Sequence, residues 1–320
     1  MELAKPKDYF LVARVDHWVK QLFVLPGLVT GWVLCRPDVP PLSELVLPII
    51  LGLLATCLIA SANYVLNDWL DAAYDRHHPL KAQRPFVLRQ PNKLIILFEY
   101  GVLVAAGLGI SLLINPWVFR IQVVLLISGW IYNLKPIRSK DIPFIDVLTE
   151  SLNNPLRFLV GWFLVTESQI PPSSVLLAYW MGGAFLMGIK RYAEYQTVRT
   201  IQGDDALTAY RRVFRIYTGE RLLVSSFFYA LLSAFMMAVF LIKYRIEYLL
   251  LFPFISALFA SYLRVALKPA SRAQTPEKLI HEKALWFVVA LLLVLFVFCS
   301  IVDIPQLHIL IDPILGTLRS

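Results

Sequence analysis

The sequence predicts an all-α protein that crosses a membrane nine times, and both composition and patterning support this class. Of the 320 residues, 58% are hydrophobic and 16% are charged, with a mean hydropathy of +0.65. A soluble domain carries about 25% charged residues. The apolar residues gather in blocks close to the ~20 residues that a helix needs to span a bilayer. Nine such blocks occur, at roughly 22–36, 46–66, 94–114, 116–134, 144–165, 174–189, 222–242, 248–263 and 284–302.

The basic residues predict how these blocks are oriented. The net charge is +8. Most Lys and Arg lie near the N-terminus and in four alternate connections, 67–93, 135–143, 190–221 and 264–283. This alternation follows the positive-inside rule. It predicts a multi-pass protein of the inner (cytoplasmic) cell membrane, with the N-terminus and the basic loops in the cytoplasm and the C-terminus outside. It gives no support for nucleic-acid binding.

Residues 1–320 are predicted to form a single membrane domain, in which 1–20 is a short cytoplasmic segment before the first block. That block is short, and 174–189 and 248–263 are near the lower length limit, so their ends are approximate. No internal repeat or low-complexity tract divides the chain. The sequence is compatible with a homo-oligomer but does not specify one.

Three carboxylates stand where the second apolar block ends, in the stretch NDWLDAAYD. On a helix, Asp68, Asp71 and Asp75 fall within an arc of about 60°, with Asn67 beside them. Like charges at this spacing repel, and near a bilayer they also lose solvation. A Mg²⁺ ion would remove both problems, since it favours carboxylates, water and substrate phosphate oxygens. The alternative is that these acids pair with neighbouring cations, namely Arg76, Lys81 or Arg84.

The loop that follows carries cations suited to phosphate. Lys81 and Arg84 stand on the same short connection as the acids, which predicts a diphosphate site. His77 and His78 are the other candidates for metal ligands in this loop. Mg²⁺ prefers oxygen ligands, and adjacent histidines point apart on a helix, so we expect a loop or structural role for both.

The stretch NDWLDAAYD resembles the NDxxDxxxD motif of the UbiA-type intramembrane prenyltransferases. Four segments resemble one branch of that superfamily, the decaprenyl-phosphate phosphoribosyltransferases: 13–27, 67–85, 132–147 and 188–195. The resemblance implies a nine-helix bundle around a central cavity. It also implies that Asp68, Asp71 and Asp75 act in catalysis by holding Mg²⁺, with Asn67, against a substrate diphosphate.

A second polar stretch, GIKRYAEYQTVR, distinguishes between branches of this family. Relatives that use a prenyl diphosphate usually carry two acids four residues apart there, whereas this chain has Glu194 among Lys190 and Arg191. Cations suit a phosphate group better than a second Mg²⁺. The alternative is that Lys190 and Glu194, four residues apart, form a simple exposed ion pair.

Further residues complete the predicted substrate site. Arg157 interrupts an apolar block, where a guanidinium is costly and normally faces a cavity or a partner. We expect it to bind a phosphate or an acid in the cavity, and a structural ion pair is the alternative. Lys20 precedes the first block, where snorkelling into the interface is equally plausible. The full set of predicted substrate-binding residues is Lys20, Asn67, Lys81, Arg84, Tyr132, Lys135, Arg157, Lys190, Arg191, Tyr192 and Glu194.

The resemblance implies a function that the composition alone does not. It is the Mg²⁺-dependent transfer of a phosphoribosyl group from phosphoribosyl diphosphate to a polyprenyl phosphate, for a cell-envelope glycan precursor. The chain departs from the branch after Pro85, where FVLRQPNK replaces small residues, so the pentose or the lipid length could differ. Two alternatives remain: an aromatic prenyltransferase of quinone or haem biosynthesis, and a membrane transporter or scaffold. Lipid chain length, the number of metal ions and the downstream pathway are not specified.

Overall fold

The computed structural model describes residues 2–36, 39–268 and 283–310. The regular elements in these ranges are all helices, and one isolated β-bridge joins Leu3 and Gln90. The α-helices are α1 Pro6–Val12, α2 Leu25–Leu34, α3 Leu42–Asp75, α4 Pro85–Leu88, α5 Lys93–Ile114, α6 Pro116–Asn133, α7 Ile145–Ser151, α8 Asn153–Phe163, α9 Ser173–Gln202, α10 Asp204–Tyr210, α11 Gly219–Tyr244, α12 Phe252–Ala266 and α13 Lys283–Ile301. Short 3₁₀ segments connect them: η1 Val15–Val24, η2 Lys81–Gln83, η3 Ser139–Asp141, η4 Arg212–Arg215, η5 Ile246–Leu251 and η8 Pro305–Leu310.

The all-helical prediction is confirmed, whereas the count of nine membrane spans is not. Within the described ranges, four helical stretches are long and apolar enough to cross a membrane: Leu42–Asp75, Lys93–Ile114, Gly219–Tyr244 and Ile246–Ala266. Each of the other expected spans also coincides with helix. Several of these helices are shorter or more polar than a full span, and the block at 144–165 is split into α7 and α8.

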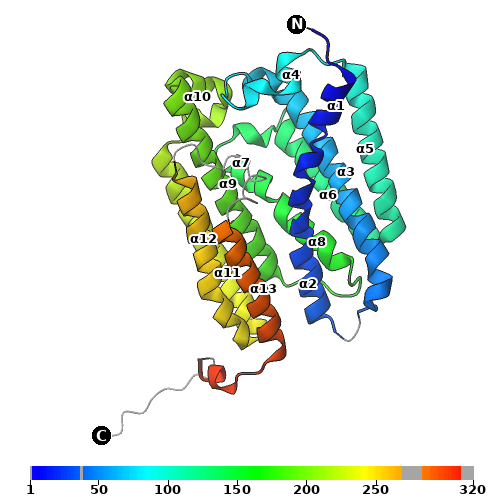
Figure 1. Ribbon diagram of the computed structural model, residues 1–320, viewed down its shortest axis with the longest axis vertical. Helices are drawn as coiled ribbons and strands as arrows, with labels where there is room; N and C mark the ends of the chain where they lie inside the picture. The colour runs from blue at the N-terminus through cyan, green and yellow to red at the C-terminus, as the bar shows by residue number, and fades with distance from the viewer. Residues whose placement is uncertain (1, 37–38, 269–282, 311–320) are drawn as a thin grey trace.

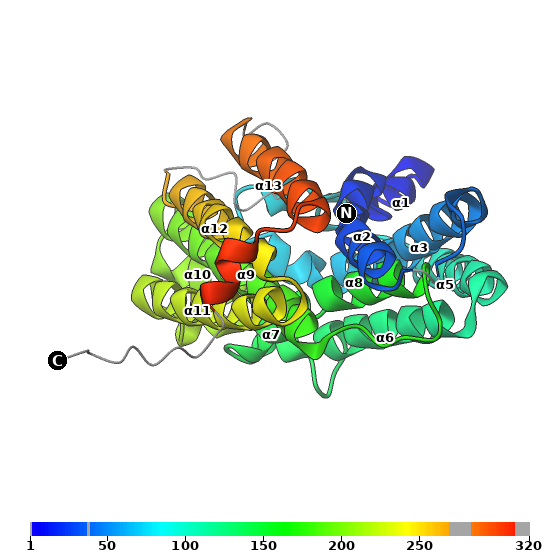
Figure 2. The same ribbon diagram turned by 90° about the horizontal axis from the view of Figure 1, so that it is seen from below.

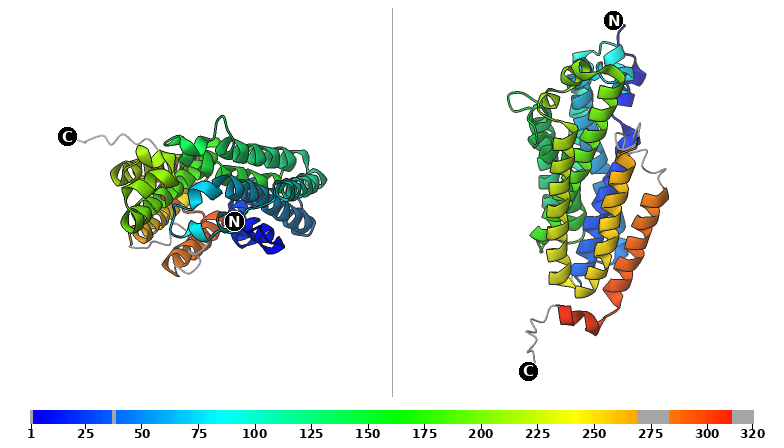
Figure 3. Two further views of the ribbon diagram at one scale, coloured as in Figure 1. Left: turned by 90° about the horizontal axis from the view of Figure 1, so that it is seen from above. Right: turned by 90° about the vertical axis from the view of Figure 1, so that its left-hand side faces the viewer.

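The helices form an elongated bundle with distinct ends. Figure 1 shows α3, α5 and α6 along one side, α9, α11 and α12 along the other, and α2 and α8 between them. The view from below in Figure 2 gives the same grouping, with α13 on the side of α12. Helices α1, α4 and α10 gather at one end, and η8 lies at the opposite end (Figure 3).

The hairpin of α5 and α6 shows how single residues define these helices. Asn115 ends α5, and its side-chain carbonyl accepts a hydrogen bond from Val118 N at 2.8 Å to start α6. Pro116 occupies the first helical turn, where its missing N–H costs nothing. The Asn115 amide also donates to the carbonyl of Phe163 at 2.7 Å, which ties the hairpin to the end of α8.

Glycines let α2 and α8 approach until their backbones touch. A Cβ atom on Gly27 would lie 1.9 Å from the carbonyl oxygen of Phe158, and one on Gly161 would lie 2.0 Å from that of Val24. No rotamer change can relieve a contact with backbone. The close approach holds η1 and α2 against α8, which carries Arg157, and so fixes the middle of the bundle.

We therefore expect Gly161→Ala to destabilise the protein by about 1–3 kcal/mol, the usual cost of overpacking a filled interior. The matched control is Gly109→Ala on α5, where an added Cβ has no neighbour within 4 Å. Thermal unfolding of the detergent-solubilised variants measures both. Equal melting temperatures for the two variants would contradict this account of the α2–α8 contact.

Candidate active site

The three acids of the NDWLDAAYD stretch lie in the last turns of α3 and are buried. Asp68, Asp71 and Asp75 expose 4%, 8% and 3% of their surface. Each pairs with a basic side chain from another segment, and the partners are Arg14, Arg84, Arg138 and Lys140. The acids are thus neutralised within the fold by residues that come from three separate connections.

Arg84 brings two of these acids together. Its Nη1 atom donates to Asp68 Oδ1 at 3.0 Å and to Asp75 Oδ2. Burial opposes the charged form of Arg84, but the two carboxylates outweigh it, so its pKa is raised. Of the cations considered as alternative partners, Arg84 takes this role, whereas Lys81 pairs with Glu194 instead.

Asp71 is bound from the connection between α6 and α7. Lys140 Nζ lies 2.6 Å and Arg138 Nη2 lies 3.1 Å from its Oδ1 atom. Burial lowers the pKa of Lys140 to about 8, and Asp71 acts against that change. In the described residues, the only non-glycine positions with positive φ are Arg14, Arg138 and Phe144. The first two bind the acids directly, so unusual backbone conformations concentrate beside this site.

A second network surrounds Arg191 on α9, which is fully buried. Its Nε atom donates to Asp146 Oδ2 at 3.1 Å and its Nη1 atom to Glu194 Oε2 at 2.8 Å, while Nη2 contacts Glu150. Nη2 also donates to the hydroxyl of Tyr132 at 2.9 Å. Arg191 therefore joins α9 to α6 and α7, and all three of its nitrogens have partners.

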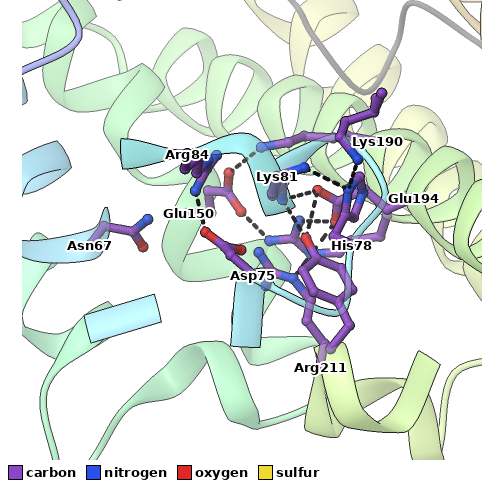
Figure 4. A network of polar contacts seen from close by, with 12 residues as sticks. Asn67, Asp75, His78, Lys81, Arg84, Glu150, Lys190, Glu194 and Arg211 are labelled. Carbon is purple, nitrogen blue, oxygen red and sulfur yellow. Dashed lines mark hydrogen bonds and ion pairs between the residues drawn. The ribbon is translucent and has the colours of Figure 1, made fainter. Parts of the chain in front are cut away.

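Glu194 is shared by cations from three segments. Lys81 Nζ lies 2.8 Å from Oε1, while Arg191 Nη1 and Arg211 Nε lie 2.8 Å and 3.7 Å from Oε2. Lys190 pairs with Glu150 at 2.8 Å rather than with Glu194, so the simple pair of residues four apart is not formed. Figure 4 shows Glu150 and Glu194 enclosed by Lys81, Lys190 and other basic side chains.

His78 shapes the loop that carries Lys81. Its Nδ1 atom accepts hydrogen bonds from the backbone N–H groups of Leu80 and Lys81, at 3.1 and 3.4 Å. Burial, helped by the charge of Lys81, lowers the pKa of His78 to about 3, so the ring is neutral. The expected loop role is therefore confirmed for this histidine. Burial also lowers the pKa of Lys81, against the pull of Glu194.

The remaining predicted residues fall into two groups. Lys20 contacts His17 Nδ1 at 3.1 Å and Arg157 contacts Gln21, so both face the interior beside η1. Three residues lie apart from the networks: Asn67, whose side-chain amide donates a long hydrogen bond to Asp68 at 3.5 Å; Lys135, which is exposed; and Tyr192, which packs against the aromatic cluster under α10. Asn67 stands away from the other side chains in Figure 4.

The donor set fits a divalent cation in its chemistry. No group of three or more His, Cys, Asp or Glu side chains is arranged as a metal centre within the part of the chain that the structure describes. Yet Asp68 and Asp75 converge on a single cationic atom, Arg84 Nη1, and all their donor atoms are oxygens, as Mg²⁺ prefers. A small polar recess opens beside these acids, lined by Asp71, Tyr74, Asp75, Lys140, Asp141, Tyr210, Arg211 and Arg212.

Several residues of the two networks are missing from the predicted set: Arg14, Arg138, Lys140, Asp146, Glu150, Tyr210 and Arg211. One signal was available for two of them. Asp146 and Glu150 stand four apart in a predicted membrane span, where an acid requires a partner. Tyr210 and Arg211 carry no such signal, because they lie in a long basic connection and reach Glu194 only through the fold.

The chain belongs to the UbiA prenyltransferase family, whose sequence model matches residues 23–287. It is 31% identical over 210 residues to the nodulation protein NoeC of Azorhizobium caulinodans, covering 65% of this chain and 63% of that one. It is 26% identical over 202 residues to a decaprenyl-phosphate phosphoribosyltransferase of Corynebacterium glutamicum, covering 57% and 52%. A 4-hydroxybenzoate octaprenyltransferase of Serratia proteamaculans is 25% identical over 179 residues, covering 56% and 57%. The chain thus spans less than two-thirds of the length of these relatives.

A solved structure shares the fold. The UbiA homolog from Archaeoglobus fulgidus bound to GPP and Mg²⁺ matches with a TM-score of 0.67 at 21% identity, over 89% of this chain and 99% of that one. The resemblance drawn from the sequence motifs is confirmed at the level of the family and its fold. Membership of a prenyltransferase family favours the enzyme alternatives over a transporter or scaffold.

The Arg191 network yields a prediction about stability. Arg191→Ala leaves the buried carboxylates of Asp146 and Glu194, and the partly buried one of Glu150, without their common partner. Breaking a buried pair in this way costs about 3–5 kcal/mol. Lys190→Ala is the matched control, because Lys190 is more exposed and pairs with Glu150 alone. We expect a large fall in melting temperature for the first variant and a small one for the second. Similar melting curves would show that Arg191 does not hold the site together.

Proposed function

We propose that the protein transfers a phosphoribosyl group from phosphoribosyl diphosphate to a polyprenyl phosphate and releases diphosphate. One observation carries the proposal: Glu194, the single acid of the stretch GIKRYAEYQTVR, is surrounded by Lys81, Arg191 and Arg211. With Asp146 and Glu150, which also pair with Arg191, three carboxylates at this site face four cations, Lys81, Lys190, Arg191 and Arg211. Cations in excess of acids favour a donor that carries a phosphate at each end.

The diphosphate of the donor would bind at the end of α3. Asp68, Asp71 and Asp75 would hold Mg²⁺, which supplies charge neutralisation for a diphosphate when bound. Lys81 and Arg84 stand on the adjoining loop and would donate hydrogen bonds to the diphosphate oxygens. The 5-phosphate would lie toward the cations around Glu194. Because burial among apolar helices excludes water, these contacts are stronger than they would be in solution.

The transfer needs no acid–base pair. The bond between the anomeric carbon and the diphosphate oxygen breaks, and its electron pair leaves with the diphosphate. A lipid phosphate oxygen then supplies the electron pair of the new bond, from the opposite face, so the configuration inverts. Because a phosphate dianion carries no proton at the attacking oxygen, the protein only has to orient the partners and stabilise charge.

Two further features support this reading. The similarity to a decaprenyl-phosphate phosphoribosyltransferase runs over 57% of the chain. The basic N-terminal segment and loops gather at one end of the bundle with the site, as expected if that end faces the cytoplasm of a cell whose inner membrane holds the protein. The lipid product would serve cell-envelope glycan synthesis.

The aromatic prenyltransferase remains the alternative within the family. It shares the fold and the acids of α3, and a relative bearing that activity is matched at 25% identity. It requires a prenyl diphosphate donor and an aromatic acceptor. The two reactions therefore differ in their donors, which makes them separable in one assay.

We expect the purified protein to transfer label from phosphoribosyl diphosphate into polyprenyl phosphate, with release of diphosphate, and to lose this activity in excess EDTA. Restoring Mg²⁺ should restore it. The same preparation is offered a prenyl diphosphate with an aromatic acid. Robust transfer from that donor, with none from the sugar donor, would make the proposal wrong.

We expect Asp68→Asn and Asp71→Asn each to abolish the transfer, because each removes a charge from the proposed metal face. Melting temperatures check that the fold survives. Asp205→Asn, an exposed acid on α10, is the control and should keep full activity. If both α3 variants work at the rate of the unmodified protein, Mg²⁺ is not held by these residues.

A further inference from the structure

Arg157 is a buried cation without an anionic partner. It lies on α8, exposes 8% of its surface and forms no ion pair with any residue in the described ranges. Its contacts are to neutral amides: Nε donates to Gln21 Oε1 at 2.8 Å and Nη1 to Asn154 Oδ1 at 3.2 Å. The structural ion pair considered from the sequence is therefore not formed with a described residue.

Gln21 adds a second unsatisfied donor at the same place. The residue exposes 1% of its surface, and its Nε2 group is buried with no hydrogen-bond partner in the described part of the chain. Its carbonyl is held by Arg157. The Arg157 guanidinium and the Gln21 amide thus lie side by side, and the Gln21 Nε2 group has N–H donors that no described residue accepts.

Burying a charge without a counter-charge costs several kcal/mol, and an unmade buried hydrogen bond adds to that. Proteins rarely retain such groups unless something satisfies them. An anion with several acceptor oxygens would satisfy both donors at once. A phosphate monoester has this chemistry, and arginine is suited to it because its planar group donates two parallel hydrogen bonds.

The depth of Arg157 separates it from the end of α3. The guanidinium lies close enough to Cys57 and Tyr64 of α3 to interact with them electrostatically. These residues precede Asp68 by about 11 and about 4 positions, which is ~16 Å and ~6 Å farther into the bundle at 1.5 Å per residue. The site therefore lies on the membrane side of the acids.

Polar side chains connect the two levels. The ring of Tyr64 contacts His17 edge-on at 5.1 Å and has Lys20 Nζ 6.0 Å from its centre. His17 in turn contacts Arg14, which pairs with Asp68. An anion held at Arg157 would thus reach the acids of α3 through polar surroundings.

We propose that Arg157 and Gln21 bind the phosphate of the lipid acceptor. The inference rests on the proposed function. It adds a separate binding site for the phosphate of each substrate. The cations around Glu194 lie at the level of the loops and would take the phosphate of the water-soluble donor. Attack on the sugar requires the acceptor oxygen to lie on the side away from the diphosphate, and a phosphate at Arg157, on the membrane side of the acids, meets this need when the sugar lies between the two levels.

The test measures binding rather than turnover. The full chain in zwitterionic nanodiscs, in EDTA and without donor, is titrated with polyprenyl phosphate, with the uncharged polyprenol and with ribose 5-phosphate. We expect Arg157→Gln to raise the Kd for polyprenyl phosphate roughly tenfold to a hundredfold, which is the loss of affinity expected when a charged hydrogen bond is removed. The Kd values for polyprenol and ribose 5-phosphate should not change.

A second variant keeps the test decisive if Arg157→Gln folds poorly. Gln21→Glu places a carboxylate beside Arg157, so it should raise the melting temperature of the ligand-free protein and still weaken polyprenyl phosphate binding at least tenfold. Gln122→Met removes another buried amide, on α6, which bonds Thr56 at 2.6 Å. As the control, it should lower stability without changing any Kd.

Three results would overturn the assignment: unchanged lipid binding in Gln21→Glu, equal binding of polyprenol and polyprenyl phosphate, or weaker binding of ribose 5-phosphate in Arg157→Gln. The last would assign the site to the donor. This test measures binding and not transfer. If the protein binds the phosphate lipid through Arg157 but is inactive in the transfer assay, the proposed reaction is rejected and this binding site is kept.

Discussion

A charged side chain among apolar helices needs a partner of opposite sign, and the ion pairs of Arg191 meet this need for three acids, Asp146, Glu150 and Glu194. Arg191 holds Glu194, Glu194 holds Lys81, and Lys81 stands on the loop whose Arg84 binds the acids of α3. The two networks of ion pairs, one at α9 and one at α3, are therefore joined through the loop that carries Lys81 and Arg84. Because each member neutralises the next, the position of any one of them depends on the others.

The loops at this end are as much part of the site as the helices. The acids of α3 come from one helix, but their cations come from the segment after α1, the loop after α3 and the connection after α6. Arg14 and Arg138 adopt left-handed backbone conformations to reach them. Such conformations cost free energy in a side-chain-bearing residue and persist where surrounding contacts require them. The acids thus organise the loops, which in turn close the site toward the end that holds α4 and α10.

The sequence predicted what depends on local periodicity and missed what depends on long-range contacts. The acids of α3 were found because a 3.6-residue period places them on one face, and the apolar blocks were found because their hydropathy is continuous. The partners of Arg191 were missed, because nothing in the order of residues joins Asp146 to a cation 45 positions later. Segment lengths were also misjudged where a block carries polar residues: 174–189 is the apolar part of α9, which continues to Gln202 through the second site.

The two kinds of buried cation have different consequences for anionic substrates. Arg191 is saturated by carboxylates, so it stabilises the fold and orients Glu194, and a phosphate could bind it only by displacing an acid. Among the described residues, Arg157 has only neutral hydrogen-bond partners. Its positive charge can therefore be balanced by an anion that enters the bundle. A water-soluble donor and a lipid acceptor approach a membrane enzyme from different media. A cationic group at the loop end and a second, uncompensated cation deeper among the helices would let both phosphates bind at once without competing for one site.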